Sequence, residues 1–157
     1  MKTFRGVEHR LEFAGEIGGV KYYNDSKATN VDAALKAIEA FPGPLVVILG
    51  GKDKGSPYTP LCDALRRRGR VALLIGEAAE KIAADLGDAV PCVHAGTLEH
   101  AIEIAADRAR PGDAVLLAPA CSSFDQFENY EHRGREFKQL VAKLGNGSAA
   151  TTAAHKG

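Results

Sequence analysis

Four short apolar runs, each separated from the next by a segment with helical spacing, constrain the fold of this 157-residue chain most strongly. Solid apolar runs that end in glycine or proline are typical of strands buried on both faces of a parallel sheet. Strands that alternate with helices require repeated right-handed crossovers. We therefore expect an α/β fold, a Rossmann-like and mostly parallel sheet with helices on both faces. The runs are residues 44–50, 70–76, 90–96 and 113–119.

Helical spacing of apolar residues predicts helices at 31–41, 58–68, 77–86, 97–108 and 130–144, with Asn30 and Thr97 suited to cap two of them. Before the first helix, two alternating runs flank Gly18 and Gly19, which predicts a hairpin that adds an antiparallel strand at one sheet edge. The segment 145–157 is small, polar and aperiodic, so we expect a domain at 1–144 and a disordered tail at 145–157.

Composition excludes several classes of protein. Lys plus Arg equals Asp plus Glu at 20 each, which argues against a dedicated nucleic-acid binder. No apolar run reaches the roughly 18 residues of a membrane span, and the start lacks the apolar core of a signal peptide. The three cysteines form no CxxC pair and are read as reduced thiols without a metal. These observations predict a cytoplasmic protein, with a monomer as the default.

Three loops combine small, charged and hydroxyl-bearing residues, and each follows a predicted strand: NDSKATN (24–30), GGKDKG (50–55) and PACSSFDQF (119–127). Ligands of open α/β sheets bind just beyond the carboxyl ends of the strands. Because these ends share one edge of a parallel sheet, we expect the three loops to meet there. Their convergence is the main prediction that the residues alone support.

The residue types in these loops are suited to an anionic ligand. Asp25 and Lys27 precede a helix amino terminus, which favours anions, although a plain turn capped by Asn30 is the alternative. Lys52 and Lys54 are point charges for a carboxylate or phosphate, or else a solvated turn.

Four further features of the sequence are interpreted as structural rather than functional by default. Phe124 and Phe127 are read as core anchors, and Cys121 has no clear histidine partner for nucleophilic catalysis. Arg10 could meet a phosphate or a base, with a surface arginine as the default. The basic run from Arg66 to Arg70 is read as a solvated helix end.

The chain resembles the Mur ligase family, the ATP-dependent ligases of peptidoglycan synthesis. The resemblance rests on HR at 9–10, NDSKATN, LGGKDKG at 49–55, and APACSSFDQFENYEHRGREF at 118–137, in this order and spacing. It covers about residues 6–144 and is greatest for the C-terminal domain of the members that add D-glutamate. In sister ligases, the position of NDSKATN is usually occupied by a string with His or Asn-Pro.

The resemblance implies a complete enzyme of three domains. ATP would phosphorylate the carboxylate of UDP-N-acetylmuramoyl-L-alanine, the amine of D-glutamate would attack the acyl phosphate, and Mg²⁺ would act mainly in a central domain. This domain would supply much of the D-glutamate pocket and part of the ATP site. The implied D-glutamate contacts are Thr29, Lys54, Ser123, Tyr130 (often Phe in the family) and Lys27, and the implied ATP contacts are Arg10, Asp25 and Asn24.

One departure from the family is that the first two domains are absent from this sequence. No GxxxxGK[ST] phosphate-binding loop occurs in it, so we expect the chain alone to be inactive, with no catalytic residue of its own. The alternatives are a free-standing module that binds a nucleotide or an acidic amino acid, or the same domain of a sister Mur ligase or of a folylpolyglutamate synthase.

Overall fold

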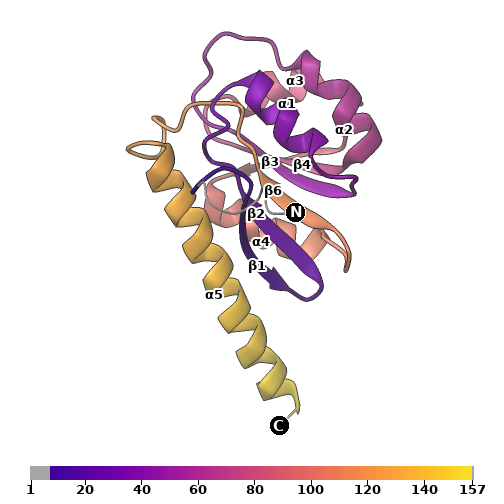
Figure 1. Ribbon diagram of the computed structural model, residues 1–157, viewed down its shortest axis with the longest axis vertical. Helices are drawn as coiled ribbons and strands as arrows, with labels where there is room; N and C mark the ends of the chain where they lie inside the picture. The colour runs from indigo at the N-terminus through magenta and orange to yellow at the C-terminus, as the bar shows by residue number, and fades with distance from the viewer. Residues whose placement is uncertain (1–7, 157) are drawn as a thin grey trace.

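The computed structural model describes the backbone of residues 8–156 and the side chains of residues 8–146. Gly6 and Val7, at the start of the segment that resembles the family, lie outside the described residues. Figure 1 shows the order of the elements along the chain. They are β1 (Glu12–Ile17), β2 (Val20–Asn24), α1 (Val31–Glu39), β3 (Leu45–Gly50), the 3₁₀ turn η2 (Thr59–Leu61), α2 (Cys62–Arg68), β4 (Gly69–Ile75), α3 (Ala79–Leu86), β5 (Cys92–Gly96), α4 (Leu98–Arg108), β6 (Ala114–Leu117) and α5 (Tyr130–Lys156).

The six strands form one sheet in the order β1-β2-β6-β3-β4-β5. Only β1 and β2 pair antiparallel, and the other four neighbouring pairs are parallel. The predicted α/β class and the hairpin at the sheet edge are therefore confirmed. Because β2, β6, β3, β4 and β5 run in the same direction, the loops that follow them leave the sheet at one edge.

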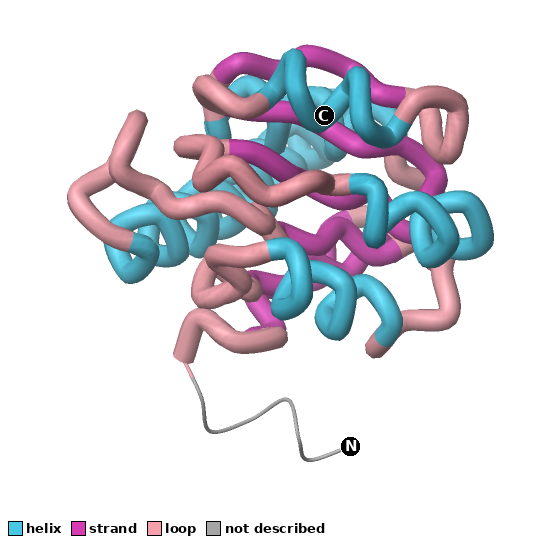
Figure 2. Tube along the Cα trace, turned by 90° about the horizontal axis from the view of Figure 1, so that it is seen from above, coloured by secondary structure: helices cyan, strands magenta, loops and turns pink. Residues whose placement is uncertain are grey.

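Helices cover both faces of the sheet (Figures 1 and 2). One apolar cluster joins α1, α2 and α3 to one face, and a second joins α4 and α5 to the other. All six residues of β3 are buried, as expected for a central strand covered on both sides. The sheet is thus a fixed platform from whose edge the loops project.

The predicted caps are confirmed, because the side chains of Asn30 and Thr97 accept the backbone N–H groups of Ala33 and His100. The helix predicted at 58–68 is divided into η2 and α2. Arg70 does not belong to a solvated helix end. It lies in β4, and its Nε is 2.6 Å from Oδ2 of the buried Asp113.

The closing helix is longer than the sequence predicts. Its expected end was residue 144, with a disordered tail at 145–157, but the α5 backbone is helical to Lys156. Four alanines between 149 and 154 explain part of this, since alanine has the highest helix propensity of all residues. The predicted end of the helix is therefore wrong. The division into a domain and a tail stays a prediction.

Candidate functional site

The three polar loops are joined by backbone hydrogen bonds at the carboxyl edge of the sheet. Ala120 N–H donates to the Ala28 carbonyl at 2.9 Å, and Lys52 N–H donates to the Ser122 carbonyl at 2.9 Å. Gly51 permits the second contact, because its φ is +138° and a Cβ there would overlap the Ser122 carbonyl. The loops at 24–30, 50–55 and 119–127 therefore form one continuous rim, as the strand order predicts.

A buried arginine at the start of α5 reinforces this rim. Arg133 is 0% exposed and donates to the Ser26 hydroxyl, the Ser26 carbonyl and the Cys121 carbonyl at 2.9, 2.8 and 3.1 Å. Burial lowers its pKa to about 10, so it stays charged at neutral pH. Arg133 lies in the segment at 118–137 that carries the family resemblance, but the sequence alone does not show that its side chain is buried. Arg133 fixes the 24–30 loop against the 119–127 loop.

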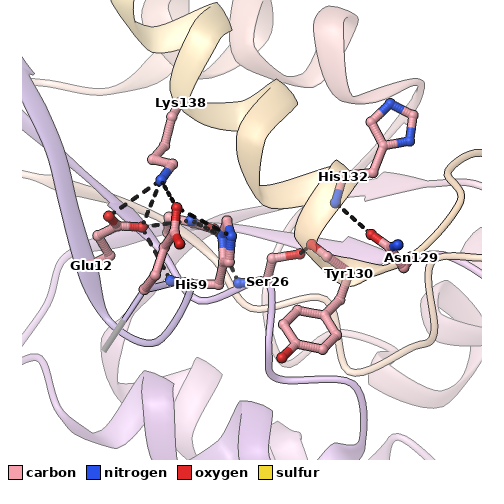
Figure 3. A network of polar contacts seen from close by, with 9 residues as sticks. His9, Glu12, Ser26, Asn129, Tyr130, His132 and Lys138 are labelled. Carbon is pink, nitrogen blue, oxygen red and sulfur yellow. Dashed lines mark hydrogen bonds and ion pairs between the residues drawn. The ribbon is translucent and has the colours of Figure 1, made fainter. Parts of the chain in front are cut away.

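A second polar network fixes the segment before β1 (Figure 3). The Asn24 amide nitrogen lies 3.0 Å from His9 Nδ1 and donates to Glu12 Oε1 at 3.1 Å, while its oxygen accepts the Ser26 N–H at 3.1 Å. Lys138 of α5 lies 3.3 Å from Glu12. Burial lowers the pKa of His9, which favours the neutral ring that accepts from Asn24.

This network gives Asn24 a role that the resemblance did not imply. Its side chain is 0% exposed, and both of its polar atoms are hydrogen-bonded within the protein. The geometry therefore does not support the implied direct contact with ATP. Asn24 instead holds His9 and Ser26, which flank Arg10 and Asp25 in the sequence.

Three of the implied site residues meet in one cavity. Arg10, Asp25 and Lys27 line a pocket of about 240 Å³ between the segment before β1 and the start of α1. Lys27 thus lies with two of the three implied ATP contacts, although the resemblance assigned it to the D-glutamate carboxylates. The other lining residues are Leu11, Ala28, Asn30, Asp32, Ala33, Lys36 and Ala37.

The carboxyl group of Asp25 is chemically unusual. Burial raises its pKa from 3.8 to about 6, against the opposing effects of the Arg10 charge, the Leu11 amide and the Lys27 charge. Asp25 is only 6% exposed. A buried carboxylate beside two cations can accept hydrogen bonds from ligand hydroxyl groups while the cations face an anion. The pocket is thus suited to a phosphorylated or ribose-bearing ligand.

The GGKDKG loop directs its charges in two directions. Lys52 and Lys54 are exposed, whereas the Asp53 carboxylate turns toward the protein and lies 3.3 Å from Lys81 Nζ of α3. The two lysines therefore stand free for an anion, and Asp53 anchors the loop between them. An acidic residue between two lysines was the only sequence signal for this anchor.

The remaining implied D-glutamate contacts lie on the rim or at its end and do not line the 240 Å³ pocket. Thr29 and Tyr130 are half-buried, and Ser123 is buried. Their contacts with a ligand stay predictions. Phe127 packs against the core as predicted, but Phe124 is 67% exposed, so its assignment as a core anchor is wrong.

Within residues 8–146, no group of three or more His, Cys, Asp or Glu side chains is arranged to hold a metal ion. All three cysteines are free thiols. Over the described part of the chain, no helix combines the length and apolar character needed to cross a membrane.

Comparison with known proteins assigns the class. Residues 9–121 match the family described as Mur ligase, glutamate ligase domain. The match covers most of the chain, and the fold and the joined loops agree with it. The chain therefore belongs to the Mur ligase family.

Two relatives with high sequence identity to the chain carry the same name. The chain is 63% identical over 141 residues to UDP-N-acetylmuramoylalanine–D-glutamate ligase of Acidobacterium capsulatum, covering 90% of this chain and 31% of the relative. It is 61% identical to the enzyme of the same name from Solibacter usitatus, covering 92% of this chain and 33% of the relative. The chain thus spans about a third of the length of the curated relatives that it matches.

Solved structures support the fold. A murein peptide ligase of Psychrobacter arcticus matches with a TM-score of 0.61 at 14% identity, over 92% of this chain and 31% of that one. A folylpolyglutamate synthase of Mycobacterium tuberculosis complexed with ADP matches with a TM-score of 0.53 at 14% identity, over 86% and 32%. At this identity the likeness concerns the fold alone.

Proposed function

We propose that this chain is the C-terminal domain of an ATP-dependent ligase that adds D-glutamate to UDP-N-acetylmuramoyl-L-alanine. The observation that carries the proposal is the identity of 61–63% to ligases of that name over nearly the whole chain. In the proposed reaction, ATP converts the substrate carboxylate to an acyl phosphate. The deprotonated amine of D-glutamate then attacks the acyl carbon, and phosphate leaves.

The domain contributes binding groups rather than a reacting group. Arg10 and Asp25 line the nucleotide side, and Lys27 adds a second cation to that pocket. Lys54, Thr29, Ser123 and Tyr130 form the acceptor side at the rim. A dicarboxylate needs cationic or donor-rich groups at both ends, and the exposed Lys54 together with the loop amides supplies one of them.

The remaining parts of the reaction belong to the rest of the enzyme. Mg²⁺ and the phosphate-binding loop are proposed to lie in another domain, so the isolated chain is proposed to be inactive. Closure of this domain over that site would exclude water and complete the acceptor pocket. A cytoplasmic location and a monomeric state belong to the same proposal.

An acceptor comparison tests the function. The full-length ligase that carries this domain is supplied with ATP, Mg²⁺ and UDP-N-acetylmuramoyl-L-alanine, and phosphate release is measured with D-glutamate, L-glutamate, D-alanine or diaminopimelate. We expect release with D-glutamate alone. A preference for another amino acid would identify a sister ligase. The isolated chain is the control, and phosphate release by it would contradict the proposed division of labour.

A further inference from the structure

A buried tyrosine lies beneath two of the loops that form the rim. Tyr58 is 2% exposed and lies three residues after the end of the 50–55 loop in the sequence. Its backbone N–H donates to Asp85 Oδ2 of α3 at 2.9 Å, and its ring belongs to the apolar cluster under α1, α2 and α3. The backbone and ring of Tyr58 are therefore fixed by the core, so its hydroxyl has a defined position.

That hydroxyl contacts one residue from each of two loops. It donates to Asp53 Oδ1 at 2.8 Å and lies 3.1 Å from the Cys121 sulfur. An ionised carboxylate only accepts hydrogen bonds, so the tyrosine proton goes to Asp53 and the Cys121 thiol can donate to the tyrosine oxygen. The hydrogen bond from Tyr58 is the largest cause of the lowered pKa of Asp53.

Lys81 holds Asp53 from the other side. Its ammonium lies 3.3 and 3.4 Å from the two carboxylate oxygens and donates to the Ser56 carbonyl at 3.0 Å. It also lies 5.4 Å from the centre of the Tyr58 ring. Asp53 is thus fixed between a buried hydroxyl and a cation.

The fixed carboxylate determines where its neighbours point. Successive side chains of an extended segment face opposite ways, and Lys52 is in an extended bridge with Ser122. With Asp53 turned inward, Lys52 and Lys54 are both exposed. The hydroxyl that orients Asp53 also contacts Cys121, which is two residues before Ser123.

We propose that Tyr58 is a positioning residue. It acts through Asp53 and Cys121 to hold Lys54 and Ser123 at fixed positions relative to each other around the acceptor amino acid. This inference rests on the proposed function and deepens it. Tyr58 touches no ligand itself. Its hydroxyl sets the distance between two loops that must grip the same dicarboxylate.

The test uses the full-length ligase with Tyr58→Phe, which keeps the buried ring and removes one oxygen. We expect the KM for D-glutamate to rise about three- to tenfold, because a hydrogen bond to a charged group is lost, with the KM for ATP unchanged. Tyr22→Phe is the matched control, since Tyr22 is equally buried but belongs to the core cluster on the other face of the sheet. Equal KM values for D-glutamate in the two variants would overturn the proposal.

Lys81 provides an independent arm if Tyr58→Phe does not fold. Lys81→Met should raise the KM for D-glutamate, because it removes the positive charge that holds the Asp53 carboxylate. Lys81→Arg keeps that charge and should therefore leave the KM near normal. An unchanged KM in Lys81→Met would also overturn the positioning role. Lys54→Ala distinguishes a failure of the proposed function from a failure of the positioning role of Tyr58. No effect of Lys54→Ala on D-glutamate would sink the proposed function itself, whereas an effect of Lys54→Ala without one of Tyr58→Phe sinks only this inference.

Discussion

Arg133 and Ser26 lie 107 residues apart in the chain, yet the Arg133 guanidinium donates to both the hydroxyl and the carbonyl of Ser26. The Ser26 hydroxyl in turn donates to the Tyr130 carbonyl at 2.7 Å. The first turn of α5 is thereby attached to the loop that carries Asp25 and Lys27. One buried side chain thus couples the loop of the proposed nucleotide side to α5 and to the 119–127 loop.

Replacing Arg133 should strongly destabilise the domain. Arg133→Met leaves the buried Ser26 and Cys121 carbonyls without these donors, and breaking such a buried charged network costs about 3–5 kcal/mol. We expect thermal unfolding of the chain to shift down by about 10 °C. The control is Arg135→Met, an exposed arginine in the same helix turn, which should change stability by less than about 0.5 kcal/mol. Similar losses in both variants would contradict the buried role.

Asp25 predicts a pH-dependent stability. Burial raises its pKa in the folded chain to about 6, so the folded state binds this proton more tightly than the unfolded chain does. Stability due to this group is greatest below about pH 4 and falls as the pH rises through 6. Asp25→Asn should therefore stabilise the chain by up to about 2–3 kcal/mol at pH 7.5. The gain should vanish near pH 4.

Urea unfolding of both forms at the two pH values measures this difference. A gain of equal size at both values would show that Asp25 is not the titrating group. The same variant should lose nucleotide affinity in the full-length ligase, since the amide has no charge to offer. A gain in stability together with a loss of affinity is expected when a buried charge that binds a ligand destabilises the folded chain.

The sequence predicted the framework of the site well, for a local reason. Apolar runs such as 44–50 mark buried strands, and parallel strands bring their following loops to one edge whatever the order of the strands. The same reasoning could not place Phe124, because a single aromatic residue in an irregular loop has no periodicity to say whether it faces inward.

The sequence does not predict the contacts of the site between residues that are far apart along the chain. His9 has a positive φ of 66° and reaches Asn24 beside α5, which depends on the finished packing of the domain. The burial of Arg133 has the same origin, and so does the presence of Lys27 in the pocket with Arg10. Residues that are far apart in the sequence come into contact when α5 packs against the β1–β2 hairpin, and local sequence patterns do not predict such contacts.

Substitutions on the two sides of the site should separate the two substrates. Lys54→Ala in the full-length ligase should raise the KM for D-glutamate about tenfold or more, because a charged contact is lost, while the KM for ATP stays near normal. Arg10→Ala should do the opposite, since Arg10 lines the pocket with Asp25. Lys21→Ala is the control, because Lys21 lies at the amino-terminal end of β2, at the other edge of the sheet. Equal effects on both substrates would contradict the assignment.

Gly134 should be intolerant of any side chain although it lies within a helix. A Cβ there would overlap His9 Nδ1 and approach the Asn24 amide to 3.1 Å. Gly134→Ala should therefore break the His9–Asn24 pair and destabilise the chain by about 1–3 kcal/mol, the cost of leaving buried polar groups unpaired. Gly145→Ala is the matched control in the same helix, where the added Cβ meets only Ile17 at an ordinary 3.5 Å.

The control should have the opposite sign, because alanine favours a helix over glycine by up to about 1 kcal/mol. His9→Ala should lower stability alone but remove the clash in combination with Gly134→Ala. The loss in the double variant should therefore be smaller than the sum of the two single losses. Strictly additive losses, measured by urea unfolding, would show that the glycine does not serve this contact.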